Sequence, residues 1–220
     1  QFPIPILAAD AVLAQGSYVF DQSCQLEGGF AFYIWPNSDF VITFGGYHPS
    51  FNKPAYYPSV NRIGFKWQVN DALMIKGGIY FALTPAAVMA GGVLNATYNS
   101  GPVSAWFIAQ ADFLLSWKPF HYGINIRIAL GANIDLALFS VNVHLGVDLQ
   151  IWGPAFGGIA NIDLSITSFS ISFGAAKILP LQLSWEEFGQ SFLPPNKEKD
   201  TNYSFDFEIM KGTASGGLIK

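Results

Sequence analysis

Asp135 and His144 are the side chains most able to do chemistry together, and both lie in one long run of alternating apolar and polar residues. If the chain reverses near residue 139, the two side chains lie about opposite each other across a hairpin. A carboxylate beside an imidazole can serve as a general base or as part of a metal site. The solvent face of a half-buried sheet carries the same residue types without any activity. An enzyme using this Asp/His pair is therefore an alternative hypothesis, and we expect a non-catalytic protein.

Two aromatic segments, GGYHPSF and KPFHYG, form the second candidate site. Each places a histidine among aromatic rings beside a proline, at the junction of expected strands. Rings combined with hydrogen-bonding groups can recognise a ligand, whereas a histidine in such a corner can also simply cap the backbone. We expect His48 and His121 to meet in one loop cluster at the mouth of an apolar interior. The candidate ligand-binding residues are Tyr47, His48, Phe51, Lys118, Phe120, His121 and Tyr122.

Other catalytic and cofactor signatures are missing from the 220 residues. There is no His-x-His, no His-Glu-x-x-His and no Cys pair, so the sequence predicts no metal site. There is also no Gly-x-Ser-x-Gly elbow and no phosphate loop with its lysine, so no cofactor is expected. The single cysteine, Cys24, allows no internal disulfide and indicates no cellular compartment.

The composition is apolar and poor in charge. Charged residues make up 12%, about half the usual share near 25%, while aromatic residues reach 16% and mean hydropathy is +0.32. A net charge of -4 without a basic run argues against nucleic acid as a partner. No stretch reaches the roughly 18 apolar residues of a membrane-spanning helix. The apolar excess fits a large core, an apolar groove, a partner interface or a membrane.

The elements that would position these residues are long strands. From Ile124 to Leu138 the even positions are apolar, and from Val141 to Ile151 the odd positions are apolar, which predicts a reversal at 138–140. The run 158–173 repeats the pattern and changes phase near residue 167. Segment 48–59, rich in proline, reads as a loop. We predict an all-β antiparallel meander that forms a barrel or an open half-barrel trough.

One face of these strands should be buried. Its predicted members are Ile126, Ile128, Ile134, Leu136, Val143, Leu145, Val147 and Leu149. Leu145→Asp should then cost several kcal/mol, because it would place an unpaired carboxylate in the core.

Three regions are expected along the chain. Residues 1–26 form an extended N-terminal segment, 27–193 a β domain, and 194–220 a linker and the start of a further strand. Ser184 and Glu187 form a capping box, which predicts a short C-terminal capping helix near 185–192 whose aromatic stripe packs on the sheet. Because the sequence starts at Gln1 and ends on a polar, glycine-rich stretch, we expect a segment of a larger protein.

The segments GGYHPSF, WKPFHY and WGPAFGG resemble the hallmarks of a domain-of-unknown-function family found in very large bacterial and fungal proteins. The resemblance covers roughly residues 27–193. It implies an all-β domain inside a longer chain and no established activity, so it implies no catalytic residues.

Two non-catalytic hypotheses follow. In the first, the protein is a binding module whose apolar trough holds a lipid or another hydrophobic small molecule. In the second, it is a structural scaffold of a giant protein whose sheet edges dock neighbouring segments of the same polypeptide or self-associate.

Overall fold

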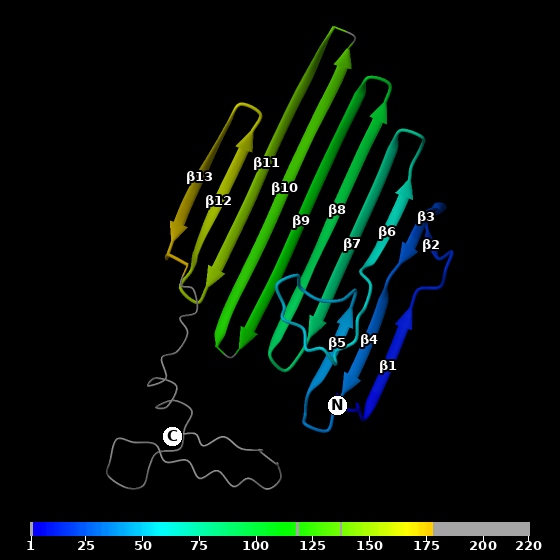
Figure 1. The fold of residues 1–220 in the computed structure, drawn as a ribbon, viewed down its shortest axis with the longest axis vertical. Helices are drawn as coiled ribbons and strands as arrows, with labels where there is room; N and C mark the ends of the chain where they lie inside the picture. The colour runs from blue at the N-terminus through cyan, green and yellow to red at the C-terminus, as the bar shows by residue number, and fades with distance from the viewer. Residues whose placement is uncertain (1, 118, 137, 178–220) are drawn as a thin grey trace, which may run out of the picture. The chain divides into compact units, whose positions relative to one another are not determined.

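The computed structural model describes residues 2–117, 119–136 and 138–177, and its 13 strands form one antiparallel sheet (Figure 1). Their bounds are β1 (Leu7–Val12), β2 (Tyr18–Val19), β3 (Asp21–Glu27), β4 (Gly29–Ile34), β5 (Phe40–Phe44), β6 (Ile63–Gln68), β7 (Leu73–Leu83), β8 (Ala87–Ser100), β9 (Val103–Trp117), β10 (Phe120–Leu136), β11 (Phe139–Gly153), β12 (Gly157–Leu164) and β13 (Thr167–Gly174). The expected helix near 185–192, the strand expected after 194 and Lys118 lie outside the described residues.

The antiparallel meander predicted from the alternation is confirmed. Strands β7 to β13 follow each other as consecutive hairpins, and β10 has 17 residues, which at roughly 3.3 Å each span about 56 Å. The predicted reversal is present, one to two residues earlier than expected, between Leu136 and Phe139. The second phase change is also a reversal, because β12 ends at Leu164 and β13 begins at Thr167.

The sheet forks at β7. The first half of β7 pairs with β6, from Gln68↔Met74 to Ile63↔Ile79, and its last residues pair with β5. On one branch, β6 continues to β3 and β2, and on the other, β5 continues to β4 and β1. The N-terminal segment 1–26, expected only to be extended, thus contributes β1, β2 and most of β3.

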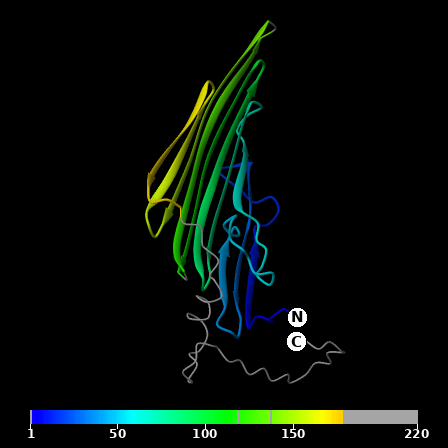
Figure 2. The ribbon, with the colours of Figure 1, turned by 60° about the vertical axis from the view of Figure 1, so that its left-hand side comes forward.

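The sheet is open, so the prediction of a barrel is wrong. Closure would require β13 to pair with β1 or β2, the ends of the two branches, but within the described residues β13 pairs with β12 alone. Figure 2 shows the two edges on opposite sides of the sheet. Side-chain alternation specifies the face on which a residue lies and carries no information about closure.

One face of the sheet, which we call the apolar face, carries all eight residues predicted to lie together. The register shows this directly, because Ile126 pairs with Leu149 and Ile128 with Val147, and paired residues project to the same side. Their predicted burial is wrong, however: Ile128 is 43% and Val143 is 57% exposed. No second layer covers this face within the described part of the chain.

The expected effect of Leu145→Asp therefore changes as well. Leu145 is 36% exposed, so a carboxylate there would reach water, and the substitution should cost far less than a fully buried charge.

The core lies on the opposite face, which we call the polar face. The loop 45–62 between β5 and β6 folds over the polar face at the β7–β8 hairpin end, where Figure 1 shows it in front of these strands. Beneath it lie two buried clusters, one built on Tyr80 and Met89 and the other on Trp35 and Val41. The loop starts at Gly45, with φ of 72°, where a Cβ atom would meet the carbonyl oxygen of Ile79.

Candidate functional site

Among the described residues of β7 to β13, no charged side chain lies on the apolar face. Its side chains on the five longest neighbouring strands, β7 to β11, are almost entirely Ile, Leu, Val, Phe, Ala and Gly. The exceptions lie close to strand ends: Tyr98, Ser100, Trp117 and Tyr122. Ile79 is 61% exposed and Phe169, far across the sheet, is 49% exposed. Large exposed apolar surfaces are typical of binding or interaction sites, which makes this face the candidate functional site.

A hollow of about 440 Å³ crosses the apolar face over β7, β8, β9 and β10. The small residues Gly77, Gly92 and Ala111 are part of its lining, and the ring of Phe65 lies against Gly77. Ile79 and Leu94 rise beside the two glycines, because each is the cross-strand partner of one of them. The full lining is Phe65, Gly77, Gly78, Ile79, Gly92, Val93, Leu94, Ala109, Gln110, Ala111, Ile126 and Ile128.

The aromatic segments predicted to form a ligand mouth lie at the same end of the sheet but divide between its faces. Tyr47 and Phe51 stack at 5.8 Å between ring centroids and pack against the buried core under the loop, beside the buried His48. Phe120 and Tyr122 alternate with His121 along β10, so their rings, 6.4 Å apart, lie on the apolar face.

His121 is exposed on the polar side of β10, with its Nδ1 atom 3.1 Å from the carbonyl oxygen of Pro119. The structure brings Tyr47, His48 and Phe51 together, and separately Phe120 and Tyr122. Lys118 lies outside the described residues. Ligand binding by any of these residues stays a prediction.

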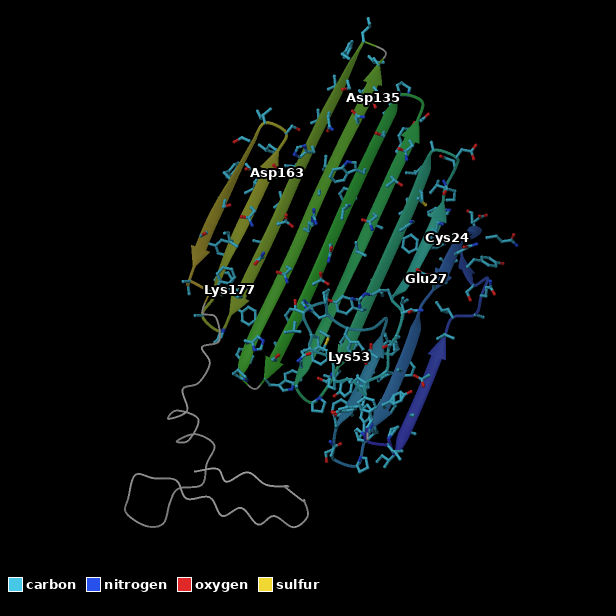
Figure 3. The ribbon with its side chains drawn as sticks, viewed as in Figure 1. Cys24, Glu27, Lys53, Asp135, Asp163 and Lys177 are labelled. Atoms are coloured by element: carbon cyan, nitrogen blue, oxygen red, sulfur yellow. The ribbon has the colours of Figure 1, made fainter. Side chains whose placement is uncertain are left out.

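The Asp135–His144 pair is not formed, so that prediction is wrong. Asp135 faces Ser140 and His144 faces Gly131, because the hairpin turns earlier than expected. The Nε2 atom of His144 lies instead 3.5 Å from the Oδ2 atom of Asp163, and both side chains are substantially exposed. Figure 3 shows Asp135 and Asp163 on different hairpins. An exposed pair of this kind contributes little to stability.

A buried polar cluster under the loop escaped prediction from the sequence. Asp112, only 7% exposed, accepts a hydrogen bond from the Tyr80 hydroxyl at 2.6 Å and another from Gln110 Nε2 at 2.6 Å. Arg62 lies over the Tyr80 ring, 3.8 Å from its centroid, and donates to the carbonyl oxygens of Gly45 and Tyr47. Burial raises the pKa of Tyr80, and the hydrogen bond to Asp112 raises it further, so the phenol stays protonated.

The sequence offered one indication of this buried cluster, which is the position of Asp112 in a strand of alternating residues. It falls on the polar side of β9, yet no sequence pattern shows that Tyr80, 32 residues away, lies beside it.

His48 should make the stability of the fold pH-dependent. Its Nδ1 accepts from the Ser50 backbone N–H at 3.0 Å, and its buried Nε2 has no hydrogen-bond partner among the described residues. Burial lowers the pKa of His48, which Asp112 partly opposes. An unfolded histidine, with a pKa near 6.5, binds a proton at pH values where the folded one does not. The stability that neutral His48 contributes is fully present above about pH 6.5. It is lost as the pH falls toward the lower pKa that His48 has in the folded state.

Urea unfolding of the intact chain at pH 7.0 and 5.5 measures this effect. The loss of stability between the two pH values should shrink in His48→Gln and persist in His121→Gln, which removes an exposed histidine. An equal loss in all three proteins would show that His48 is not the titrating group.

No group of three or more His, Cys, Asp or Glu side chains placed to hold a metal ion occurs in 2–117, 119–136 and 138–177. The same residues include no helix long and apolar enough to cross a membrane.

These features define a class of protein: an open antiparallel meander that presents one continuous apolar face. The chain belongs to a family of unknown function, DUF6603, whose model matches residues 2–212. Comparison with curated proteins and with solved structures gave no significant match. The resemblance to a family of unknown function is confirmed at that level, whereas occurrence in very large bacterial and fungal proteins stays a prediction.

Proposed function

We propose that this sheet is a non-catalytic binding module that holds the acyl chains of a lipid, or a similar hydrophobic molecule, on its apolar face as part of a larger protein. The observation that carries the proposal is the uninterrupted apolar face of β7 to β11 together with its 440 Å³ hollow. Hydrophobic contact needs no directional partner, so a surface without polar groups suits an acyl chain.

A protein partner would fit the same surface less well. The five strands β7 to β11, spaced about 4.8 Å apart and up to about 56 Å long, present roughly 1,000 Å² on one face. A protein interface carries about one hydrogen bond per 100–200 Å², so about five to ten would be expected over this area. The side chains on this face provide hydrogen-bonding groups only near strand ends, at Tyr98, Ser100, Trp117 and Tyr122.

Two measurements on the purified chain test the proposal. Native mass spectrometry and solvent extraction should reveal a co-purifying lipid. Titration with the fluorescent fatty acid cis-parinaric acid should show saturable binding, because the hollow has a defined size. A folded chain that yields no lipid and shows no saturable binding would refute a lipid-binding role.

Docking through sheet edges is the second candidate function, favoured by β13. This strand has eight residues with no charge and no proline, which are the usual protections of an edge strand. Its Ser168 and Ser170 lie on the polar side and Phe169 on the apolar side, so an added strand would extend both faces. Size-exclusion chromatography with light scattering tests it: concentration-dependent self-association abolished by Ile171→Pro would support edge pairing, and a monomer at all concentrations would exclude self-association.

A further inference from the structure

A second hollow, of about 280 Å³, lies on the polar face, opposite the proposed lipid site, and shares only Gln110 and Ile126 with the lining of the first hollow. Two neighbouring cross-strand rows on β9, β10 and β11 supply its polar side chains, which we call the polar block: Gln110, Arg127 and Asp148 in one row, and Asp112, Asn125 and Gln150 in the next. Neighbouring side chains in such a block lie about 5 Å apart across the strands. Six hydrogen-bonding side chains therefore converge on one small depression.

Contacts with neighbouring side chains hold several residues of the polar block in place. Asp112 is buried and fixed by Tyr80, and it accepts the hydrogen bond that orients the Gln110 amide. The Arg127 Nε atom lies 3.7 Å from Asp148 Oδ1, and both side chains are more than half exposed. The polar block thus has a fixed carboxylate on β9 and accessible hydrogen-bond donors and acceptors on β10 and β11.

An aromatic ring lies two rows further along the same face. Trp106 is 40% exposed, and its indole lies against Gly131, where a Cβ atom would come within 2.8 Å of the ring. The row between the ring and the block holds Ile108, Ala129 and Gly146, so a short apolar strip separates the two. The polar face therefore offers a ring and a row of hydrogen-bonding groups along one direction.

The charges of the polar block determine which class of ligand can bind there. Two carboxylates flank one guanidinium, so an anion such as phosphate would be repelled by Asp112 and Asp148. Neutral hydroxyl groups both donate and accept, which matches carboxylates, a guanidinium and amides at once. The apolar C–H face of a sugar ring packs on an aromatic ring such as Trp106.

From this arrangement we infer that the polar block and Trp106 form a binding site for a neutral oligosaccharide. The hydroxyl groups contact Asn125, Gln150 and Arg127, and a further sugar unit stacks on Trp106. Sites that hydrogen-bond a substrate hydroxyl discriminate strongly against ligands that lack it, because their own polar groups are then left unpaired.

Isothermal titration of the intact chain with four neutral hexasaccharides, made of glucose in β-1,4 linkage, glucose in α-1,4 linkage, xylose and mannose, tests this site. At least one should bind saturably, and Asn125→Ala/Gln150→Ala should weaken that binding at least tenfold. Trp106→Ala should weaken it independently of the polar block. Gln25→Ala, which removes an exposed amide from the same face on the distant strand β3, should leave the affinity unchanged.

Three results would overturn the proposal: a folded chain that binds none of the four sugars, equal affinity in the double variant and the unsubstituted chain, or an equal loss in Gln25→Ala. Circular dichroism confirms that each variant is folded. Leu94→Glu, on the apolar face, should keep full sugar affinity, so failure of the lipid site and failure of the sugar site give different results.

Discussion

Trp35→Ala should lower the free energy of unfolding by about 3–5 kcal/mol, the usual cost of truncating a large buried aromatic side chain. Trp35 is 2% exposed, and its ring stacks on Tyr57 at 5.3 Å and on Tyr33 at 5.7 Å between centroids. Tyr56 meets it edge-on at 5.2 Å. The substitution would leave a cavity where the loop 45–62 is fastened to the sheet. Urea unfolding followed by tryptophan fluorescence measures the loss.

Trp106→Ala is the matched control, since it removes the same side chain from the open polar face. Trp106 is 40% exposed, so its removal leaves no enclosed cavity and should cost about 1 kcal/mol or less. If Trp35→Ala lowered the free energy of unfolding no more than Trp106→Ala does, the packing of the loop 45–62 on Trp35 would not be a main source of stability.

The importance of this loop could not be predicted from the sequence. Segment 48–59 is rich in proline and reads as a loop, and loops usually lie on the surface. Here the loop supplies Tyr56 and Tyr57, whose hydroxyls donate to the Asp39 carboxylate at 2.7 and 2.6 Å. Only the folding of the loop onto the polar face brings these tyrosines to Trp35 and Asp39.

The strands themselves were predictable because their side chains alternate over unusually long runs. The alternation identifies residues that share a face, and Ile128 and Val147 do share one. It does not identify what covers that face. An exposed apolar face and a buried one have the same pattern, so burial, closure and the location of the core were beyond the sequence.

The Asp135–His144 prediction failed for a geometric reason. In an antiparallel hairpin, moving the turn by two residues moves every cross-strand partner by four. A turn centred near residue 139 would pair Asp135 with His144, whereas the observed register pairs Asp135 with Ser140. A change in the phase of the apolar and polar alternation locates a turn to within one or two residues. This precision is too low to assign a catalytic pair.

Leu94→Glu should weaken binding of cis-parinaric acid at least tenfold with little loss of stability. Leu94 borders the hollow of the apolar face and is 39% exposed, so the folded protein can keep the new carboxylate in water. A bound acyl chain would cover it, and burying an unpaired carboxylate costs several kcal/mol. A tenfold loss corresponds to only about 1.4 kcal/mol, so the expected effect is well within that cost.

Asn95→Glu provides the control, because it adds the same charge at the next residue of β8, on the polar face. It should leave fatty-acid affinity unchanged. Ala111→Phe fills the hollow without adding charge, so weaker binding in this variant would place the acyl chain in the hollow itself. Equal losses in Leu94→Glu and Asn95→Glu would show that the carboxylate acts through the net charge of the protein and that the apolar face does not hold the ligand.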